Sequence, residues 1–231
     1  MCIIDFISLA VIILFIVLGY KRGVIKTGIQ FIGLLAVLVL SFAFKVYLAN
    51  FLMKYLPFFD LAGSFKGITA INILIYNLLS FIFLFVIFYC LFSIILSLSD
   101  IVNKIVELAV VLEKPSKLLG AVVGLFEGVI IAFLMTFILF HVSFTQPLIG
   151  GSKFSIVLLE RTPIIGTMAV PTTLVLEDIN NIIVNAGENE QTEDLNFKVI
   201  NTLIYHRYIT RESAQELVDN NKFHFEDRVS F

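Results

Sequence analysis

Charged residues are scarce in this chain. Lys, Arg, Asp and Glu make up 15% of the 231 residues and hydrophobic residues make up 59%, whereas a soluble domain carries roughly 25% charged residues. The shortage is concentrated in the first two thirds, and it excludes an ordinary soluble globular domain. The formal net charge of −2 gives no reason to expect nucleic-acid binding. We therefore expect an integral membrane protein whose main partner is the lipid bilayer.

Cysteine is nearly absent. The two cysteines, Cys2 and Cys90, lie in or beside apolar segments, and their spacing predicts neither a disulfide nor a metal site. We interpret both as small apolar side chains. Before the first apolar run there is no Lys or Arg, and no small-residue cleavage site follows it, so a signal peptide is not predicted. The first run is interpreted as a retained span.

The common catalytic motifs are also missing. The sequence contains no Gly-x-Ser-x-Gly, no His-Glu-x-x-His, no P-loop, no dinucleotide-binding fingerprint and no membrane-embedded Asp pair. Its three histidines, His141, His206 and His224, are scattered, and none has a second His or Cys at ligand spacing. We therefore predict that the protein is not an enzyme, with no catalytic residues, no metal site and no cofactor.

Two apolar runs, 3–20 and 24–44, are separated only by the basic break Lys21, Arg22 and Gly23. A break this short allows only a tight turn, and each run is long enough to cross a bilayer as a helix. The pattern predicts a transmembrane helical hairpin. Asp5 stands at the start of the first run, and we expect it to be a solvated charge at the helix end.

Polar residues inside the second and third spans have two readings. Lys26 and Gln30 lie four residues apart on one helix face. Lys26 is near enough to the end of its span to reach the headgroups, which we favour over a place on an ion path. In the span 68–98, Asn77 and Ser80 lie three residues apart. We favour hydrogen bonds between helices for this pair, with a solute path as the alternative.

The fourth span, 118–144, carries the sharpest pattern. Gly120, Gly124, Gly128 and Ala132 recur at four-residue intervals. Such a stripe of small residues lets a second helix approach to backbone contact, so we predict that it packs helices. The alternative is the general tolerance of membrane helices for glycine.

Glu127 lies beside this stripe. An ionised carboxylate within a bilayer costs at least a few kcal/mol, so it should face protein or water, be paired, or be protonated. Lys26 is a candidate partner if the ends of the second and fourth spans meet. We favour structural pairing over proton or ion handling.

The remaining segments complete an all-α, polytopic fold. Residues 45–59 suggest an interfacial amphipathic helix that ends before Pro57, and 99–117 a short surface helix stopped by Pro115. The tail predicts helices over 172–186, 194–208 and 210–220, the last with Thr210 as N-cap. We expect a domain of about four spans in residues 1–144 (3–20, 24–44, 68–98 and 118–144) and a polar helical region in 145–231.

Three short motifs resemble the colicin V production protein family of bacterial membrane proteins. They are the turn Lys21, Arg22 and Gly23, the stretch 119–128 around the glycines, and 155–159 followed by Pro163. The resemblance covers roughly Asp5 to Pro163, and the family is usually basic where this chain has Glu127. It implies a protein of the cytoplasmic (inner) membrane with four spans, linked to toxin export and envelope maintenance and without known catalytic residues.

Two functional hypotheses follow. The first is an accessory or scaffold protein that binds an envelope or export partner, or a second copy of itself, through the glycine stripe or the tail. The alternative is a small oligomeric channel or transporter with Glu127, Asn77 and Lys26 along its path. Basic residues near the spans number six on the side of the short turn against five on the other, and short loops weigh most. We therefore predict both termini outside the cytoplasm.

Overall fold

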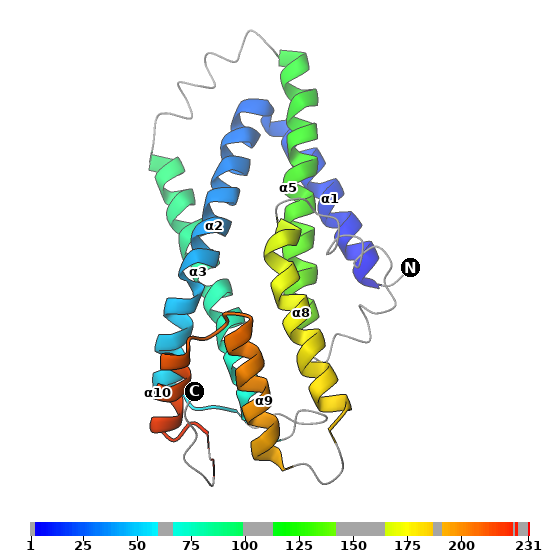
Figure 1. Cartoon of the computed structure of the whole chain (residues 1–231). Helices are drawn as coiled ribbons and strands as arrows, with labels where there is room; N and C mark the ends of the chain where they lie inside the picture. The colour runs from blue at the N-terminus through cyan, green and yellow to red at the C-terminus, as the bar shows by residue number, and fades with distance from the viewer. Residues whose placement is uncertain are drawn as a thin grey trace. The chain divides into compact units, whose positions relative to one another are not determined.

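The computed structural model describes residues 3–59, 67–98, 113–141, 165–186, 191–223, 225 and 231. Within these residues every regular element is a helix (Figure 1), which confirms the all-α prediction. The helices are α1 (Ile3–Arg22), α2 (Val24–Tyr55), the 3-10 turn η2 (Thr69–Ile71), α3 (Asn72–Leu98), α5 (Glu113–His141), α8 (Ile165–Val184), α9 (Thr192–Tyr205) and α10 (Arg211–Asp219).

Four of these helices are long and apolar enough to cross a membrane, as predicted. The candidate spans are Ile3–Arg22, Val24–Tyr55, Thr69–Ser97 and Ser116–Leu139. About 20 residues suffice to cross the hydrocarbon core of a bilayer. The 32 residues of α2 are therefore about 12 more than one crossing needs.

Helix α2 differs from its prediction because it does not stop at Phe44. The sequence suggested a span over 24–44 and a separate interfacial helix over 45–59, but one continuous helix runs to Tyr55. No Gly or Pro interrupts the chain between Phe44 and Tyr55, so the backbone hydrogen bonds continue. The helix ends before Pro57 as expected, because a residue that precedes proline avoids the helical conformation.

Two prolines that were predicted to lie at helix boundaries lie inside helices instead. Pro115 lies in the first turn of α5, which begins at Glu113, so it does not end a surface helix at this point. A proline is tolerated there because its missing N–H would have no helical partner. Helix α8 likewise begins at Ile165 and includes Pro171, whereas the predicted helix began at Thr172. The rest of the predicted surface helix, 99–112, lies outside the described residues.

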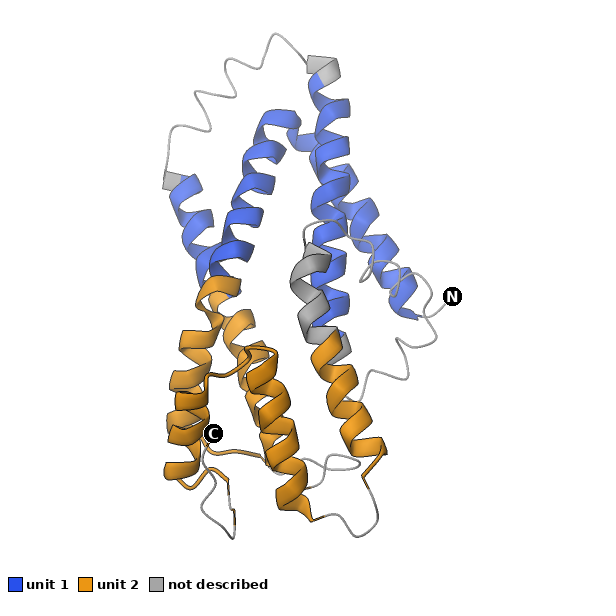
Figure 2. Cartoon of the chain, in the orientation of Figure 1, with its two compact units in different colours: residues 1–41, 85–169 blue, residues 42–84, 170–231 orange. Residues whose placement is uncertain are grey.

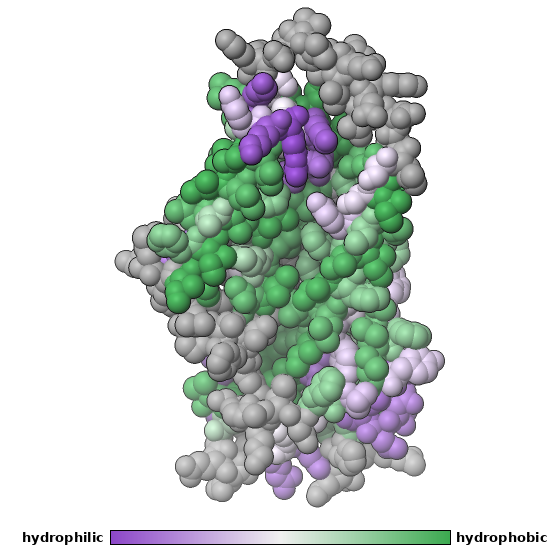
Figure 3. Space-filling model, turned by 180° about the vertical axis from the view of Figure 1, so that it is seen from behind, coloured by the Kyte–Doolittle hydropathy of each residue, from purple (hydrophilic) through white to green (hydrophobic). Residues whose placement is uncertain are grey.

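The chain divides into two compact units (Figure 2). Unit 1 comprises 1–41 and 85–169, and unit 2 comprises 42–84 and 170–231, so the divisions between them fall inside α2, α3 and α8. The sequence suggested a boundary at residues 144 and 145, which are not among the described residues. In unit 1, hydrophilic side chains gather at the end with the α1–α2 turn, and hydrophobic ones cover the helices beyond it (Figure 3).

Unit 2 has one hydrophobic core that joins the tail to the α2–α3 hairpin. Helices α8, α9 and α10 bury apolar side chains against the last turns of α2 and the first turns of α3. The fully buried members are Ala49, Ala70, Ile73, Val175, Val199, Ile200, Leu203 and Ala214. Thr210 caps α10 as predicted, because its hydroxyl oxygen accepts a hydrogen bond from the Ser213 N–H at 3.1 Å.

Candidate functional site

The glycine stripe of α5 lies directly against the backbone of α1. A Cβ atom added to Gly120 would lie 2.7 Å from the carbonyl carbon of Gly23, and one added to Gly128 would lie 2.9 Å from the Cα of Ile12. An added Cβ on Gly124 would lie 3.2 Å from the Cα of Gly19. At Gly124 an added Cβ would also overlap the carbonyl oxygen of Phe15. Real Cβ atoms do not approach backbone atoms to less than about 3.0 Å, so each of the three positions requires glycine. The helix that occupies the stripe is therefore α1 of the same chain.

Helix α1 contributes small residues of its own to this contact. Gly19 of α1 and Gly23 of the turn that follows it stand four residues apart, the spacing found on α5. A Cβ on Gly19 would lie 3.0 Å from both the carbonyl carbon of Gly120 and the Cα of Gly124. The two helices therefore pack small residue against small residue, as close membrane helix pairs do. Ala132 continues the α5 stripe and is completely buried.

The α1–α2 turn is fastened to the start of α5. Gly23 has φ of +77°, a conformation that glycine adopts without steric cost. The next N–H, that of Val24, donates a hydrogen bond to Ser116 Oγ at 3.3 Å. Thr27 is buried, and its hydroxyl donates to the Gly23 carbonyl oxygen at 2.8 Å. These bonds fix the turn at one end of the α1–α5 pair.

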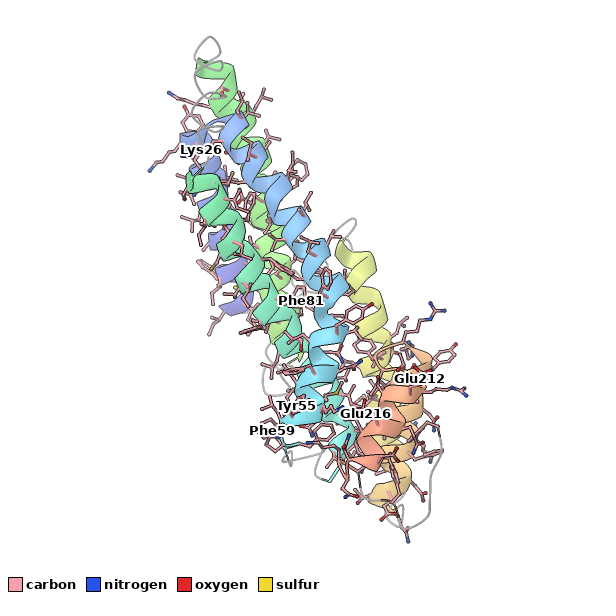
Figure 4. All side chains as sticks on the ribbon, turned by 90° about the vertical axis from the view of Figure 1, so that its left-hand side faces the viewer. Lys26, Tyr55, Phe59, Phe81, Glu212 and Glu216 are labelled. Atoms are coloured by element: carbon pink, nitrogen blue, oxygen red, sulfur yellow. The ribbon has the colours of Figure 1, made fainter. Side chains whose placement is uncertain are left out.

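A buried acidic group lies on α5 between two glycines of the stripe. Glu127 is only 4% exposed, and the guanidinium of Arg22 interacts with it electrostatically. Arg22 Nη1 also donates a hydrogen bond to Gln30 Oε1 at 2.7 Å. Lys26, the partner that the sequence suggested for Glu127, is exposed and projects from the surface (Figure 4). Arg22 thus bonds to Gln30 and contributes to the electrostatic surroundings of Glu127, whereas Lys26 lies toward solvent or headgroups.

The buried face of α1 is polar at its other end. Asp5 is only 4% exposed, so the expectation of a solvated end charge is wrong. Ser8, one turn further along, is completely buried, and its Oγ has no hydrogen-bond partner among the described residues. The register set by the glycines, continued antiparallel along α5, brings Ser8 level with Ala132. The helix–helix contact therefore extends over most of α1.

Asn77 and Ser80 are both buried, at 2% and 0% exposure. The Asn77 side-chain amide donates to the carbonyl oxygen of Ile73 in its own helix at 2.9 Å. Asn77 Oδ1 and Ser80 Oγ have no partner in the described part of the chain. Within the described part of the chain, the hydrogen bond between helices that we favoured for this pair is thus not formed.

Among the described residues, no three His, Cys, Asp or Glu side chains gather as metal ligands would. His206 pairs with Asp178, with 2.7 Å between Nε2 and Oδ2. The side chain of His141 and the whole of His224 lie outside the described residues.

Sequence reasoning missed a polar clamp in unit 2. Asn196 of α9 is 7% exposed; its Oδ1 accepts from the Ala70 N–H at 2.9 Å, and its Nδ2 donates to the Gly67 carbonyl oxygen at 3.1 Å. Asn72 binds the backbone of Phe59 in the same way. The Phe59 N–H donates to Asn72 Oδ1 at 3.0 Å, and Asn72 Nδ2 donates to the Phe59 carbonyl oxygen at 2.9 Å. These asparagines hold the backbone at the α2–α3 connection. Nothing in their local sequence distinguishes them from exposed asparagines, because their partners lie far away in the chain.

The other missed residues lie around the turn. Ser116 and Thr27 are single hydroxyl residues without a motif of their own, so no sequence signal marked them. Gly19 could have been found, because it precedes Gly23 by four residues and so repeats the spacing on α5.

Comparison with known proteins identifies the family. The family model of the colicin V production protein matches residues 4–163, which is more than half of the chain. No curated protein and no solved structure is significantly similar to the chain. The matched range includes the α1–α2 turn, the glycine stripe and Glu127. The chain, with its four apolar helices, therefore belongs to the colicin V production protein family.

Proposed function

We propose that this membrane protein is an accessory or scaffold protein of the bacterial cell membrane, that it serves toxin export or envelope maintenance, and that it works by contact. The observation that carries the proposal is that the residues of the most distinctive sequence motifs make contacts between helices. The three glycines, the basic turn and Arg22 all serve packing between α1, α2 and α5. Because α1 fills the stripe, the tail helices of unit 2 offer the surface for an envelope or export partner, or for a second copy.

Complementation in a strain that lacks the protein tests the proposal. The measured quantities are toxin export and envelope integrity. We expect a Glu127→Gln chain to restore both, because glutamine keeps the size and hydrogen-bonding capacity of the buried group. Photo-crosslinking from Val184, which is 70% exposed on α8, should give a defined adduct with an envelope or export protein. Leu40 of the apolar α2, 44% exposed, is the control and should crosslink mainly to lipid. Equal adducts from both positions would contradict a contact surface on the tail.

A small oligomeric channel or transporter is the second candidate. The burial of Glu127, Asn77 and Ser80 favours it, because polar groups within membrane helices often mark solute paths. The purified protein in proteoliposomes should then carry an ion or proton flux that falls at least about tenfold in Glu127→Gln, since the removed charge would be on the path. A flux that Glu127→Gln leaves unchanged would reject Glu127 as a path residue.

We also propose that both termini lie outside the cytoplasm. An even number of spans places the two ends on one side, and the short basic turn with Lys21, Arg22 and Lys26 favours the cytoplasmic side for itself. The tail would then be an extracytoplasmic contact surface.

A further inference from the structure

Helix α10 runs alongside the last turns of α2 in the same direction. Four contacts within unit 2 advance together along both segments. Lys45 Nζ lies 5.2 Å from the ring centre of Tyr208, Asn50 Nδ2 donates to Ser213 Oγ at 3.2 Å, Lys54 pairs with Glu216, and Lys222 Nζ donates to the Leu56 carbonyl oxygen at 2.9 Å. Figure 4 shows Glu212 and Glu216 in this order along α10. The turn between α9 and α10 therefore lies at the end of unit 2 where α2 enters it.

That end of unit 2 is the one next to the membrane. Helix α2 starts at Val24, and about 20 helical residues cross the hydrocarbon core. The helix therefore leaves the core close to Lys45. The Lys45 ammonium lies 3.7 Å from the ring centre of Phe42, a cation–π contact. Tyr208, at the α9–α10 turn, is level with this exit point.

The turn exposes an aromatic ring and two guanidinium groups. Tyr205 is 82% exposed, the most exposed of the large hydrophobic side chains in the described residues. Arg207 and Arg211 are also exposed. Tyrosine is enriched at the level of lipid headgroups, and clustered arginines bind anionic lipid phosphates.

The charge of the turn contrasts with that of the tail around it. Residues 170–231 contain eleven Asp and Glu against five Lys and Arg, and two of these five are Arg207 and Arg211. His206 of the same turn is paired with Asp178, and Glu212 follows Arg211. The two arginines thus make this turn the part of the tail that suits an anionic surface.

We propose that the α9–α10 turn, with Tyr205, Arg207 and Arg211, binds the anionic headgroups of the membrane that α2 crosses. The tail is then fixed to the bilayer surface at this turn as well as through α2 and α3. This inference does not depend on the scaffold function, because it concerns a lipid contact and not a protein partner.

Tryptophan fluorescence can test the position of the turn, because the chain contains no tryptophan. The full chain with Tyr205→Trp is placed in proteoliposomes that contain phosphatidylglycerol and brominated lipid. We expect the brominated lipid to quench the fluorescence of the introduced tryptophan, and aqueous acrylamide to quench it little. The control is Phe197→Trp on the same helix, eight residues or about 12 Å further from the turn. Equal behaviour of the two positions would overturn the proposal.

Substitutions that remove the charge of Arg207 or Arg211 test whether these arginines bind anionic headgroups. In the Tyr205→Trp background, Arg207→Gln and Arg211→Gln should each weaken the quenching that depends on phosphatidylglycerol. Each should lower the equilibrium constant for binding of the α9–α10 turn to the bilayer surface about fivefold. Lys198→Gln, an exposed position of α9, removes the same charge away from the turn and should change nothing. Quenching that is the same in phosphatidylcholine and phosphatidylglycerol vesicles would show that anionic headgroups are not recognised, and would overturn the proposal.

Discussion

Gly23 illustrates how single residues position this site. Its backbone conformation, φ of +77°, ends α1 and turns the chain into α2 within one residue. Its lack of a side chain also admits Ser116, whose Oγ would lie 2.9 Å from an added Cβ. Gly120 and Gly124 meet the same requirement from the opposite helix. The close packing of α1 and α5 depends on the absence of side chains at these glycines, since each added methyl group would push α1 away from α5.

Gly124→Ala should therefore destabilise the protein. The added Cβ would lie 3.2 Å from the Cα of Gly19 and 3.1 Å from the carbonyl carbon of Phe15, and backbone cannot move aside as a flexible side chain can. Overpacking of this kind costs about 1–3 kcal/mol. The measurement is unfolding of the purified protein in mild detergent. The matched control is Gly28→Ala on α2, where an added Cβ meets nothing within 4 Å. A Gly124→Ala chain as stable as this control would contradict the packing.

At the scale of elements, the tail helices are part of the α2–α3 hairpin's fold. Asn196 of α9 binds the backbone of Gly67 and Ala70, and Lys54 of α2 pairs with Glu216 of α10. Burial in one shared core adds to these bonds. The tail therefore stabilises the connection between the second and third spans.

Asn196→Ala should loosen that connection. The change leaves the buried Ala70 N–H and the Gly67 carbonyl oxygen without their side-chain partner, and each such loss costs about 1–3 kcal/mol. We expect faster amide hydrogen exchange at 67–72. Asn201→Ala is the control on the same helix, because Asn201 is exposed and, among the described residues, bonds only to the carbonyl oxygen of Phe197. Unchanged exchange in Asn196→Ala would show that the clamp does not hold the connection.

For the whole molecule, the shared core of unit 2 sets a topological requirement. The tail packs on the end of α2 and the start of α3, so it must lie on the same side of the membrane as the α2–α3 connection. The α1–α2 turn precedes α2, which is long and apolar enough for one crossing, so we expect the turn on the opposite side of the membrane. Sidedness can therefore be measured independently at the turn, the connection and the tail.

Single cysteines, in a chain with Cys2 and Cys90 replaced by serine, can measure the sides. With an impermeant thiol reagent on intact cells, we expect labelling at Phe59→Cys and Gln191→Cys and none at Lys21→Cys. Labelling at Lys21→Cys alone would reverse the proposed orientation. Labelling that separates Phe59→Cys from Gln191→Cys would contradict the shared core itself.

The sequence by itself determined the helical class, the four apolar spans, the tight basic turn and the family. These properties depend on neighbouring residues, since apolar length and turn residues act within a few positions along the chain. The predicted stop of α2 at Phe44 was wrong because polar residues alone do not end a helix. Pro57, two residues beyond Tyr55, marks its end correctly.

Only the tertiary structure decided which partners these elements take. It selected α1 as the helix against Gly120, Gly124 and Gly128. It also left Lys26 exposed and buried both Glu127 and Asp5. It also joined the tail to the α2–α3 hairpin through Asn196. Each of these outcomes depends on contacts between residues far apart in the chain. Spacing along one helix shows which face is suited to close packing, but the helix that packs there is set by the three-dimensional fold.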